Sequence, residues 1–590
     1  MMQVPDSPRG APSGESNAPS DVSPLYLADV RRAGPLRVVL VTPATMPGWL
    51  DDFMRLAGRA GWLDVDVLPV AGAKLPGSDC RRPELRMALA VERWRSPAGT
   101  GFATVVPVPQ SGMARPPSAP ESGRDAALMW LRERRPDLVI LAADLEGAAE
   151  IAAGARRGCW RLDASLLHEC DATFVLLSPL IEPAATTVGL EADRVDGTWR
   201  PLAVGTAATY RASLSGQRER ACRKLPALLL RGLLAELHAP EPAAGDRRVV
   251  SVRLVPPSCR PGRLATVRAF VATIGVRVRD RWNRACSREG RWSVLVRRQS
   301  EAMDPDLPSA SGYCPLVAPH GCYWADPCAI DGPDGDFVYV EECPDEVNAG
   351  VIACLRVDAA GQAERLGVAL QRPCHLSFPQ VFDWEGRRFM TVESGQDCRV
   401  TLYECGGSPL DWRPLADLIE GWQCVDPVLH FHAGHWFLFV NVAESGASSC
   451  DSLFLFVADT LTGPYRPHPA NPIVDDAGRA RMAGRLFVDR GRLVRPAQDC
   501  VGSYGAAIVF NEVLELGPDR YRERMLGRLD AEAAGARDGC HTYSRAGALE
   551  AIDVRGFGLR DAVPASRHPG HDSGGNLRPG GMSTGATARG

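Results

Sequence analysis

Acidic residues recur at the starts of several β-rich segments in the C-terminal half of the chain. Asp326 and Asp426 each precede a proline, in ADP and VDP, and Glu393 follows an apolar run in MTVES. Two carboxyl groups that flank a glycosidic bond serve as proton donor and as base or nucleophile in sugar chemistry. Such carboxylates, together with arginine and histidine, also suit a hydroxyl-rich ligand that carries a phosphate or carboxylate. The alternative for Asp326 and Asp426 is a turn residue before proline that caps a strand.

An internal repeat predicts how these residues reach one place. Similar segments, each with an apolar strand, an Asp- or Gly-containing turn and a second strand, begin at Ala325, Ser377, Val425 and Met482. The stretch from Tyr504 supplies a fifth copy. A spacing of about 50 residues is typical of a four-stranded propeller blade, whose innermost strands all direct their heads toward one mouth of the central channel. We therefore predict an all-β five-bladed propeller over 291–557, with a β-sandwich as the alternative.

The motifs WADP, HLSFP, MTVES, VDP, HPANP, RPAQDC and GCHTY follow one another along this stretch. Through them it resembles the propeller family of arabinanase- and β-xylosidase-type glycosidases, and more closely the N-terminal propeller of glucosamine inositolphosphorylceramide transferases. The resemblance implies that Asp326 is the base at the head of the first blade and that Asp426 tunes the pKa of the acid. The family's general acid is a glutamate in a Glu-Gly pair, and this chain has Ala483-Gly484 there.

The alanine at that position predicts that simple hydrolysis by the family's mechanism is impaired, because a positioned acid contributes about 10²–10⁴ in rate. Glu393 is the candidate for a replacement acid or base. His375 could equally be a buried histidine bonded to backbone, and aromatic residues such as Trp324 often pack between blades. The residues that we expect to bind substrate at the propeller mouth are Trp324, His375, Arg495, Gln498, Asp499, Tyr504 and His541.

Residues 35–240 alternate between two patterns. The apolar runs LRVVLV, DVDVLPV and DLVILAAD indicate strands, and helical spacing separates them in GWLDDFMRLAGRAGW and AALMWLRERRP. This order predicts an α/β domain with a parallel sheet. Through GCWRLDASLLH and RVDGTW the stretch resembles the catalytic domain of folate-dependent formyltransferases. Arg161 and Asp163 stand where that family has its Asn-x-His pair, and Asp196 fits the position of its aspartate.

In the formyltransferase family the histidine transfers protons and the asparagine stabilises an oxyanion. Because both are replaced here, the resemblance implies a degenerate domain that is inactive in formyl transfer. Formyl-tetrahydrofolate is expected as a cofactor only if the domain has survived as an N-formyltransferase. We predict no other cofactor and no metal site.

The ends of the chain and the segment between the two domains differ in composition. Residues 1–34 and 558–590 are rich in Pro, Ser and Gly and predict disordered tails, and 241–290 predicts a linker that holds a strand or two. The net charge of −4 offers no basic surplus for nucleic acid. The chain begins without a signal-peptide pattern and has no apolar run that could span a bilayer, which predicts a cytoplasmic protein with reduced cysteines.

Three functions are compatible with these residues. The preferred one is a carbohydrate-active protein of polysaccharide or glycoconjugate biosynthesis, which performs glycosyl transfer or cleavage at the propeller mouth with Asp326, Asp426 and Glu393. The second is a non-catalytic sugar-binding scaffold, which the change at Ala483 favours. The third is an amino-sugar N-formyltransferase with the propeller as its acceptor-binding module. The expected partner is a sugar or glycoconjugate, and the sequence gives no oligomeric state.

Overall fold

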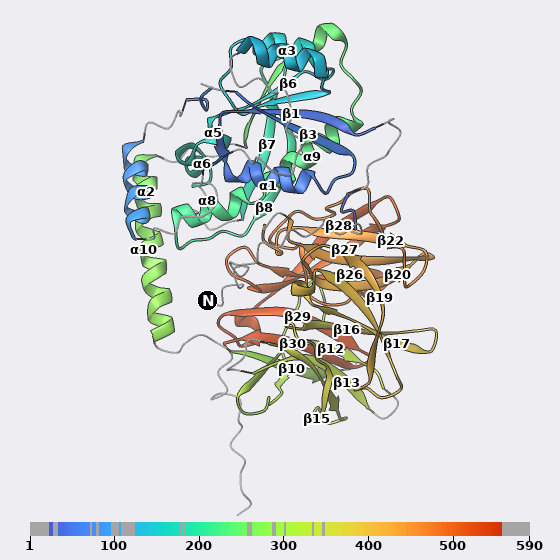
Figure 1. Cartoon of the computed structure of the whole chain (residues 1–590). Coiled ribbons are helices and arrows are strands. Elements are labelled where there is room, and N and C mark those ends of the chain that lie inside the picture. Colours follow the sequence, from blue (N-terminus) through green and yellow to red (C-terminus); the bar gives the residue numbers. More distant parts are fainter. Residues whose placement is uncertain are drawn as a thin grey trace, which may run out of the picture. The chain divides into compact units, whose positions relative to one another are not determined.

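The computed structural model describes residues 23–556 apart from several gaps. The gaps are 27–33, 71–72, 78–81, 96–104, 108–123, 178–179, 181–184, 256–261, 286–290, 300–301, 333–334, 345–348 and 445–446. The predicted tail 558–590 and most of the predicted tail 1–34 therefore lie outside the described residues. Met1–Phe557 forms one compact unit by its internal contacts, and two folds follow each other along it (Figure 1).

The C-terminal fold is a five-bladed β-propeller, as predicted (Figure 1). The first blade consists of β12 (Cys322–Ile330), β13 (Asp336–Pro344), β14 (Val351–Val357) and β15 (Ala363–Leu370). The second consists of β16 (Ser377–Trp384), β17 (Arg387–Glu393), β18 (Arg399–Cys405) and β19 (Trp412–Glu420). The third consists of β20 (Cys424–His432), β21 (His435–Val442), β22 (Leu453–Ala458) and β23 (Arg466–Pro467). The fourth consists of β24 (Arg481–Met482), β25 (Phe487–Asp489), β26 (Arg492–Asp499), β27 (Ala507–Leu516) and β28 (Tyr521–Asp530).

The fifth blade joins the two ends of the propeller sequence. Its strands are β10 (Trp292–Arg298), β11 (Cys314–Pro315), β29 (Gly539–Ala546) and β30 (Leu549–Arg555). β10 pairs with β30 along its whole length, from Trp292 opposite Arg555 to Arg298 opposite Leu549. The sequence prediction of a fifth copy from Tyr504 was wrong, because that stretch forms β27 and β28 of the fourth blade. Closure of the ring by β10 protects the edges of the sheets.

The N-terminal fold is an α/β domain around a seven-stranded sheet of order β3-β1-β5-β6-β9-β7-β8. Its strands are β1 (Leu36–Thr42), β3 (Leu63–Pro69), β5 (Leu138–Leu141), β6 (Cys159–Leu162), β7 (Thr186–Asp193), β8 (Trp199–Ala207) and β9 (Val249–Leu254). The pairs from β3 to β9 are parallel, and β7 and β8 add two antiparallel strands. The prediction of an α/β class with a mostly parallel sheet is confirmed.

Helices and one short sheet complete this domain. The helices are α1 (Gly48–Ala57), α2 (Pro83–Arg95), α3 (Arg124–Arg134), α4 (Ala148–Gly154), α5 (Ala164–Leu167), α6 (Glu169–Val175), α8 (Leu214–Cys222), α9 (Leu225–His238) and α10 (Arg263–Ala285). The short sheet pairs β2 (Thr45–Pro47) with β4 (Val105–Pro107). In the described part of the chain, no helix is both long enough and apolar enough to cross a membrane.

Two predicted boundaries differ from the structure. The expected linker 241–290 contains β9, which lies inside the α/β sheet between β6 and β7, and the 23-residue helix α10. Within the expected N-terminal tail, Leu25 and Tyr26 are buried. Both segments were misread because their Pro-rich flanks dominate the local composition, whereas a few apolar residues suffice to place a strand or an anchor in a core.

Candidate functional site

A β-bulge near the beginning of each inner strand positions the predicted aspartates. The register shifts between Ala325 and Cys328 in β12 and between Val425 and Val428 in β20. The bulge residues Asp326 and Asp426 both have φ of +50°. This left-handed conformation is uncommon for residues other than glycine and is concentrated at functional sites. A bulge redirects a side chain, and here it turns both carboxylates away from the alternation of the strand.

Two glutamates lie on the second strand of a blade, opposite the residue that precedes a bulge in β12 and a similar bulge in β16. Glu341 of β13 pairs with Ala325, and Glu393 of β17 pairs with Ser377. In each pair the glutamate follows its partner by sixteen positions, and the same offset in the third blade leads from Val425 to Asn441. Glu341 escaped the sequence reasoning, although this offset from the predicted Glu393 would have found it. Asp326, Asp426, Glu341 and Glu393 thus come together where the inner strands begin.

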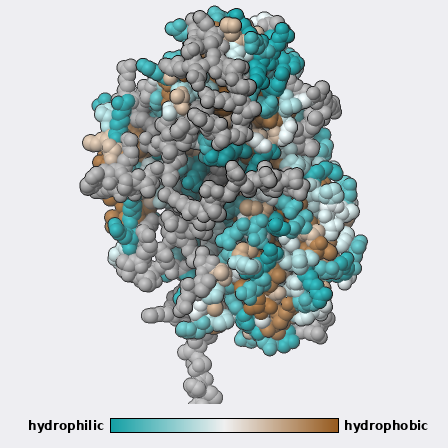
Figure 2. All heavy atoms as spheres, viewed as in Figure 1, coloured by the Kyte–Doolittle hydropathy of each residue, from teal (hydrophilic) through white to brown (hydrophobic). Residues whose placement is uncertain are grey.

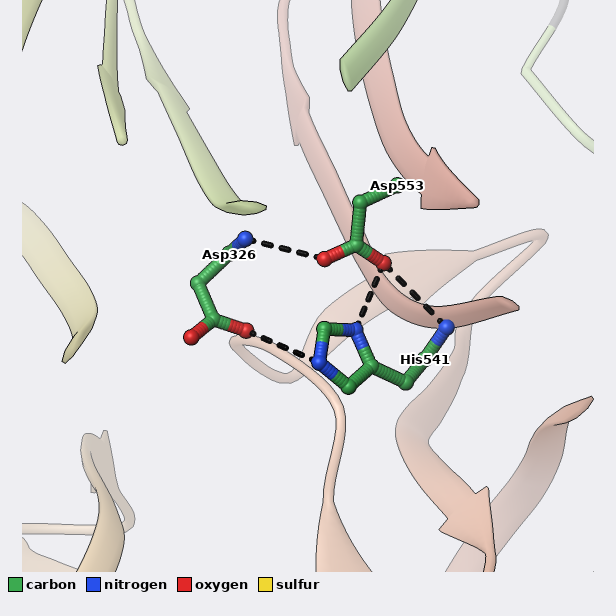
Figure 3. Close-up of side chains that lie close together, drawn as sticks. All are labelled: Asp326, His541 and Asp553. Atoms are coloured by element: carbon green, nitrogen blue, oxygen red, sulfur yellow. Dashed lines mark hydrogen bonds and ion pairs between the residues drawn. The ribbon is translucent and has the colours of Figure 1, made fainter. Parts of the chain in front are cut away.

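Asp326 belongs to a hydrogen-bonded trio with His541 and Asp553 (Figure 3). Asp553 Oδ2 accepts the backbone N–H of Asp326 at 2.9 Å, and its Oδ1 lies 2.7 Å from His541 Nδ1. His541 Nε2 faces Asp326 Oδ1 at 3.6 Å. The three residues present ligand atoms within 4.8 Å of one another, a spacing that also suits a metal ion. Because hydrogen bonds and ion pairs already engage these atoms, we interpret the trio as a relay that orients Asp326.

The trio is buried, and its charges shift each other's pKa. Burial raises the pKa of Asp326 to about 6, against the cationic His541 and with the help of the Asp553 carboxylate. Burial by itself would lower the pKa of His541, but Asp553 and Asp326 outweigh it and raise that pKa. The ring of Trp292 stacks on the imidazole with centroids 3.8 Å apart. The two carboxylates thus favour the cationic form of His541, beside an Asp326 carboxyl group whose pKa is about 6.

A second cation, Arg481 of β24, joins the other two carboxyl groups. Its Nε donates to Asp426 Oδ2 at 2.7 Å, and its Nη2 lies 3.2 Å from Glu393 Oε2. Gln498 Nε2 also donates to Asp426 Oδ2, at 3.1 Å. The guanidinium lies over the ring of Tyr504, 5.0 Å from its centroid. Gln498 and Tyr504 were predicted for this site, whereas Arg481 was missed because nothing in RARMAG distinguishes it from a solvated arginine.

The environment of the two glutamates favours their protonated forms. Burial, followed by the charges of Asp326 and Glu393, raises the pKa of Glu341 well above its usual range. Burial and the charge of Asp426 do the same for the pKa of Glu393, although Arg481 opposes them. The Glu393 side chain is 18% exposed, compared with 9% for Glu341, 7% for Asp326 and 2% for Asp426. Glu393 is thus the most accessible of the four carboxyl groups.

His375 lies at the edge of this cluster. Its Nδ1 accepts the backbone N–H of Gly350 at 2.8 Å, and its Nε2 lies 3.4 Å from Glu341 Oε1. Burial lowers the pKa of His375. The side chain is 28% exposed and bonds to backbone, as one of the two expectations has it, whereas its role in binding substrate stays a prediction.

Three predicted binding residues point elsewhere. Trp324 is buried and donates its Nε1–H to Glu342 Oε2 at 3.0 Å, inside the core between blades. Arg495 is fully enclosed and donates from Nε and Nη2 to Glu523 at 2.8 Å. Asp499 pairs with Arg528 of the outermost strand β28. These residues stabilise blades because alternation along a strand turns every second side chain away from the channel.

The position of the missing acid is closed. Ala483 is fully buried, and its backbone accepts the Tyr543 N–H at 2.8 Å. Gly484 has φ of +136°, and a Cβ there would lie 2.1 Å from the Tyr543 carbonyl oxygen. The backbone of the fifth blade thus passes directly beside the fourth at this point. The glycine of the family's pair is retained for this close approach, whereas the side chain that would carry the proton is absent.

The propeller sequence has named relatives. Residues 325–546 match the family model "Glucosamine inositolphosphorylceramide transferase 1, N-terminal". Two relatives of that name, from Oryza sativa subsp. japonica and Arabidopsis thaliana, are 32% identical over 203 residues and 31% identical over 205. Each alignment covers 34% of this chain and 27% of the relative, so the chain spans about a quarter of the relatives' length. The propeller resemblance is confirmed over this segment.

Solved structures that resemble part of this chain include two glycoside hydrolases. One is Zg3597, of family 117, from Zobellia galactanivorans, with 13% identity and a TM-score of 0.31 over 46% of this chain and 92% of that one. The other is a thermostable family-43 enzyme, with 13% identity and a TM-score of 0.29 over 38% and 84%. The formyltransferase resemblance of residues 35–240 lies outside the matched family segment and stays a prediction.

The three residues of the predicted formyltransferase site do not meet. Arg161 is exposed on β6, and Asp163 follows the end of β6 and accepts the Ser165 N–H at 2.9 Å, which caps α5. Asp196 lies in the exposed turn after β7 and accepts the Thr198 N–H. β7 runs antiparallel to β9 and β9 runs parallel to β6, so that turn lies toward the start of β6. Asp163 and Asp196 are therefore at opposite ends of the strands.

A cavity of about 230 Å³ lies at the other end of the propeller channel, away from the carboxyl groups. It is lined where the inner strands end, by Trp384, His430 and Trp436 among others. Arg485 crosses this end and donates to the carbonyl oxygens of Val381 at 2.6 Å and of Ala329 at 2.9 Å. The hydrogen bonds of Arg485 connect blades, and the cluster of carboxyl groups lies at the opposite mouth.

Proposed function

We propose that the propeller binds a sugar or glycoconjugate at its carboxylate mouth and carries out glycosyl transfer or cleavage there. Asp326 is the proposed base and Glu393 the proposed proton donor. The observation that carries this proposal is that Asp326, Glu393 and Asp426 come together where the inner strands begin, with Arg481 bonded to the last two. In that cluster burial raises the pKa of Asp326 to about 6 and raises the pKa of Glu393 well above its usual range. Groups whose pKa values are pushed apart within one site are suited to act as acid and base.

The chemistry does not require the family's acid position. In cleavage, Glu393 gives its proton to the leaving oxygen and Asp326 takes one from the attacking water. In transfer from an activated donor with a phosphate leaving group, only the acceptor hydroxyl must lose a proton, and Asp326 takes it. His541 and Asp553 hold Asp326 in place, and Arg481 holds Asp426 beside Glu393. Neither route needs an acid side chain at position 483.

The named relatives support the class of substrate. Their name describes transfer to inositolphosphorylceramide, and we therefore propose that this chain also acts on a glycoconjugate, in polysaccharide or glycoconjugate biosynthesis. The alignments cover about a quarter of each relative, so donor and acceptor are part of the proposal. A cytoplasmic location is proposed with it.

The second candidate is a sugar-binding scaffold without turnover. It is favoured by the enclosed methyl group of Ala483 and by the low exposure of Asp326 and Asp426. The N-formyltransferase alternative gains no support from the geometry, because Asp163 and Asp196 lie at opposite ends of the strands.

The test is a screen of the full chain with nucleotide sugars, sugar phosphates and oligosaccharides, followed by mass spectrometry of any sugar that stabilises it. We expect a chemically altered sugar. Glu393→Gln should reduce turnover by about 10²–10⁴-fold and leave binding in place. Glu364→Gln, an exposed carboxylate of the outer strand β15, is the matched control and should change neither. Binding without any product would establish the scaffold, and turnover unchanged in Glu393→Gln would refute the assignment of the acid.

A further inference from the structure

Helix α10 exposes most of its large hydrophobic residues to solvent. Leu264, Val267, Val271, Ile274 and Val278 are 36–73% exposed, and Trp282 is 53% exposed. They are three or four positions apart, which places them on one side of a helix. Figure 2 shows hydrophobic atoms along the left edge, where Figure 1 places α2 and α10. We call these six residues the apolar stripe.

The opposite side of α10 packs against the α/β domain mainly through polar and small residues, together with the partly buried Phe270. Thr266, Ala269 and Thr273 are at most 2% exposed. Arg277 donates to the carbonyl oxygen of Ala212 and pairs with Glu92 of α2 at 3.5 Å. The amphipathic pattern is therefore reversed relative to an ordinary surface helix, whose apolar side faces the core. Packing inside the domain does not account for the apolar stripe.

Arginines flank the stripe on both sides. Arg263, Arg268, Arg279 and Arg281 are exposed. At about 100° per residue, Arg268 and Arg279 lie along one border of the stripe and Arg263 and Arg281 along the other. The sequence of α10 contains a single acidic residue, compared with six arginines. The outward side of α10 is thus apolar at its centre and cationic at both borders.

We propose that α10 is a membrane-surface helix that lays its apolar stripe into an anionic lipid bilayer. A helix with an apolar side, bordering Lys or Arg and an aromatic residue lies in the plane of the lipid interface, where its basic side chains meet the headgroups. Trp282 has an amphipathic indole ring, which favours a position at the membrane–water interface. α10 carries too many arginines to cross the bilayer, in agreement with the lack of a membrane-spanning helix among the described residues.

Charge distinguishes this occupant from a second copy of the chain. The spacing of Leu264, Val267, Val271, Ile274 and Val278 follows a heptad, which would also fit a coiled coil. In such a pair, however, the bordering positions set the partner by opposite charges, and here arginine would face arginine. An anionic membrane surface, by contrast, attracts the same arginines.

The test is co-sedimentation of the full chain with phosphatidylcholine vesicles that do or do not contain phosphatidylserine. We expect binding only to the anionic vesicles, weakened at high salt. The double variant Val271→Glu/Val278→Glu and the double variant Arg263→Glu/Arg268→Glu should each weaken binding by about tenfold or more. Val195→Glu, which is 89% exposed in the turn between β7 and β8, is the control and should bind like the wild type.

Circular dichroism melting checks that the variants are folded. We expect them to be, because the substituted side chains are exposed, and a loss of binding can then be attributed to the altered surface. The proposal is overturned if the wild type does not sediment with anionic vesicles, or if the Val271/Val278 variant binds as well as Val195→Glu. It is also overturned if light scattering reveals a dimer that the Val271/Val278 variant dissociates while vesicles bind neither form. This experiment does not test the proposed sugar chemistry, since none of these residues belongs to the propeller mouth.

Discussion

Arg481 is the cation on which two carboxyl groups at the propeller mouth depend. Arg481 and its partner Asp426 are buried, and its second partner, Glu393, is 18% exposed. The two carboxylates lie 2.7 Å and 3.2 Å from the guanidinium nitrogens. Removing one partner of a buried ion pair leaves an uncompensated charge, which costs about 3–5 kcal/mol. Arg481→Met keeps much of the side-chain volume, and urea denaturation should show a loss of this size in the free energy of unfolding.

The matched control for Arg481 is an ion pair in solvent. Arg356 pairs with Glu364 on the outer strands of the first blade, and the two side chains are 44% and 63% exposed. Arg356→Met should change the free energy of unfolding by less than about 1 kcal/mol. Equal effects of the two substitutions would contradict the assignment of Arg481 as the buried counter-ion of the site.

The raised pKa of Asp326 predicts a pH-dependent stability. Its pKa rises from the ordinary value of 3.8 to about 6 in the folded chain. Between those values the folded state holds a proton that the unfolded state has released, so folding stability falls as pH rises through this window and then levels off. Urea denaturation at pH 4 and pH 7 should show that the wild type loses about 2–3 kcal/mol relative to Asp326→Asn. The same pH dependence in both proteins would contradict the raised pKa.

At the residue scale, the sequence revealed the site where a repeated motif marks it. Asp326 and Asp426 were predicted because the repeat and the propeller resemblance place ADP and VDP at the heads of the first and third blades. Glu341, Arg481 and Asp553 lie on strands, where an ionisable residue is indistinguishable from one that faces solvent. Their role follows from pairing between strands and blades, which single-sequence patterns do not carry.

At the scale of elements, Gly484 fixes the contact between the fourth and fifth blades. Its φ of +136° is accessible to glycine alone, and a Cβ would lie 2.1 Å from the Tyr543 carbonyl oxygen. Gly484→Ala should therefore cost about 2–4 kcal/mol, since it adds both backbone strain and a clash with backbone. The measurement is the free energy of unfolding from urea denaturation.

Gly407 separates these two contributions. It also has a positive φ, of +103°, but a Cβ there meets nothing within 4 Å. Gly407→Ala should retain the strain and lack the clash, and should cost about 1 kcal/mol. If both substitutions cost the same, the contact with Tyr543 contributes nothing.

Element types were easier to predict than their partners. The short apolar runs and turns of the first three blades predicted strands that form β12, β16 and β20, and the alternating pattern of residues 35–240 predicted the α/β sheet. The sequence VVSVRL of β9 was read as part of a linker, although it lies between β6 and β7 in that sheet. A six-residue strand has too weak a period to reveal which sheet it joins.

At the scale of the whole propeller, closure depends on a strand that is remote in sequence from its partners. β10 begins at Trp292 and pairs with β30, which ends at Arg555. A repeat of about 50 residues counts blades but does not say which strand closes the ring. For this reason the repeat predicted the fifth blade from Tyr504. In the structure, that blade consists of β10, β11, β29 and β30.

The closure predicts that a local defect in β10 destabilises the ring as a unit. Leu295 is buried, lies between β11 and β30, and pairs with Ile552. Proline there removes a backbone donor from an interior strand, so Leu295→Pro should lower the melting temperature by about 10 °C or more. Val368→Pro, on the outer edge strand β15, should lower the melting temperature less, because that strand does not take part in closing the ring. Calorimetry of Leu295→Pro should show the loss as a shift of the main propeller transition, because the blades depend on a closed ring. A small separate transition with the main one unmoved would mean that the blades are stable without closure.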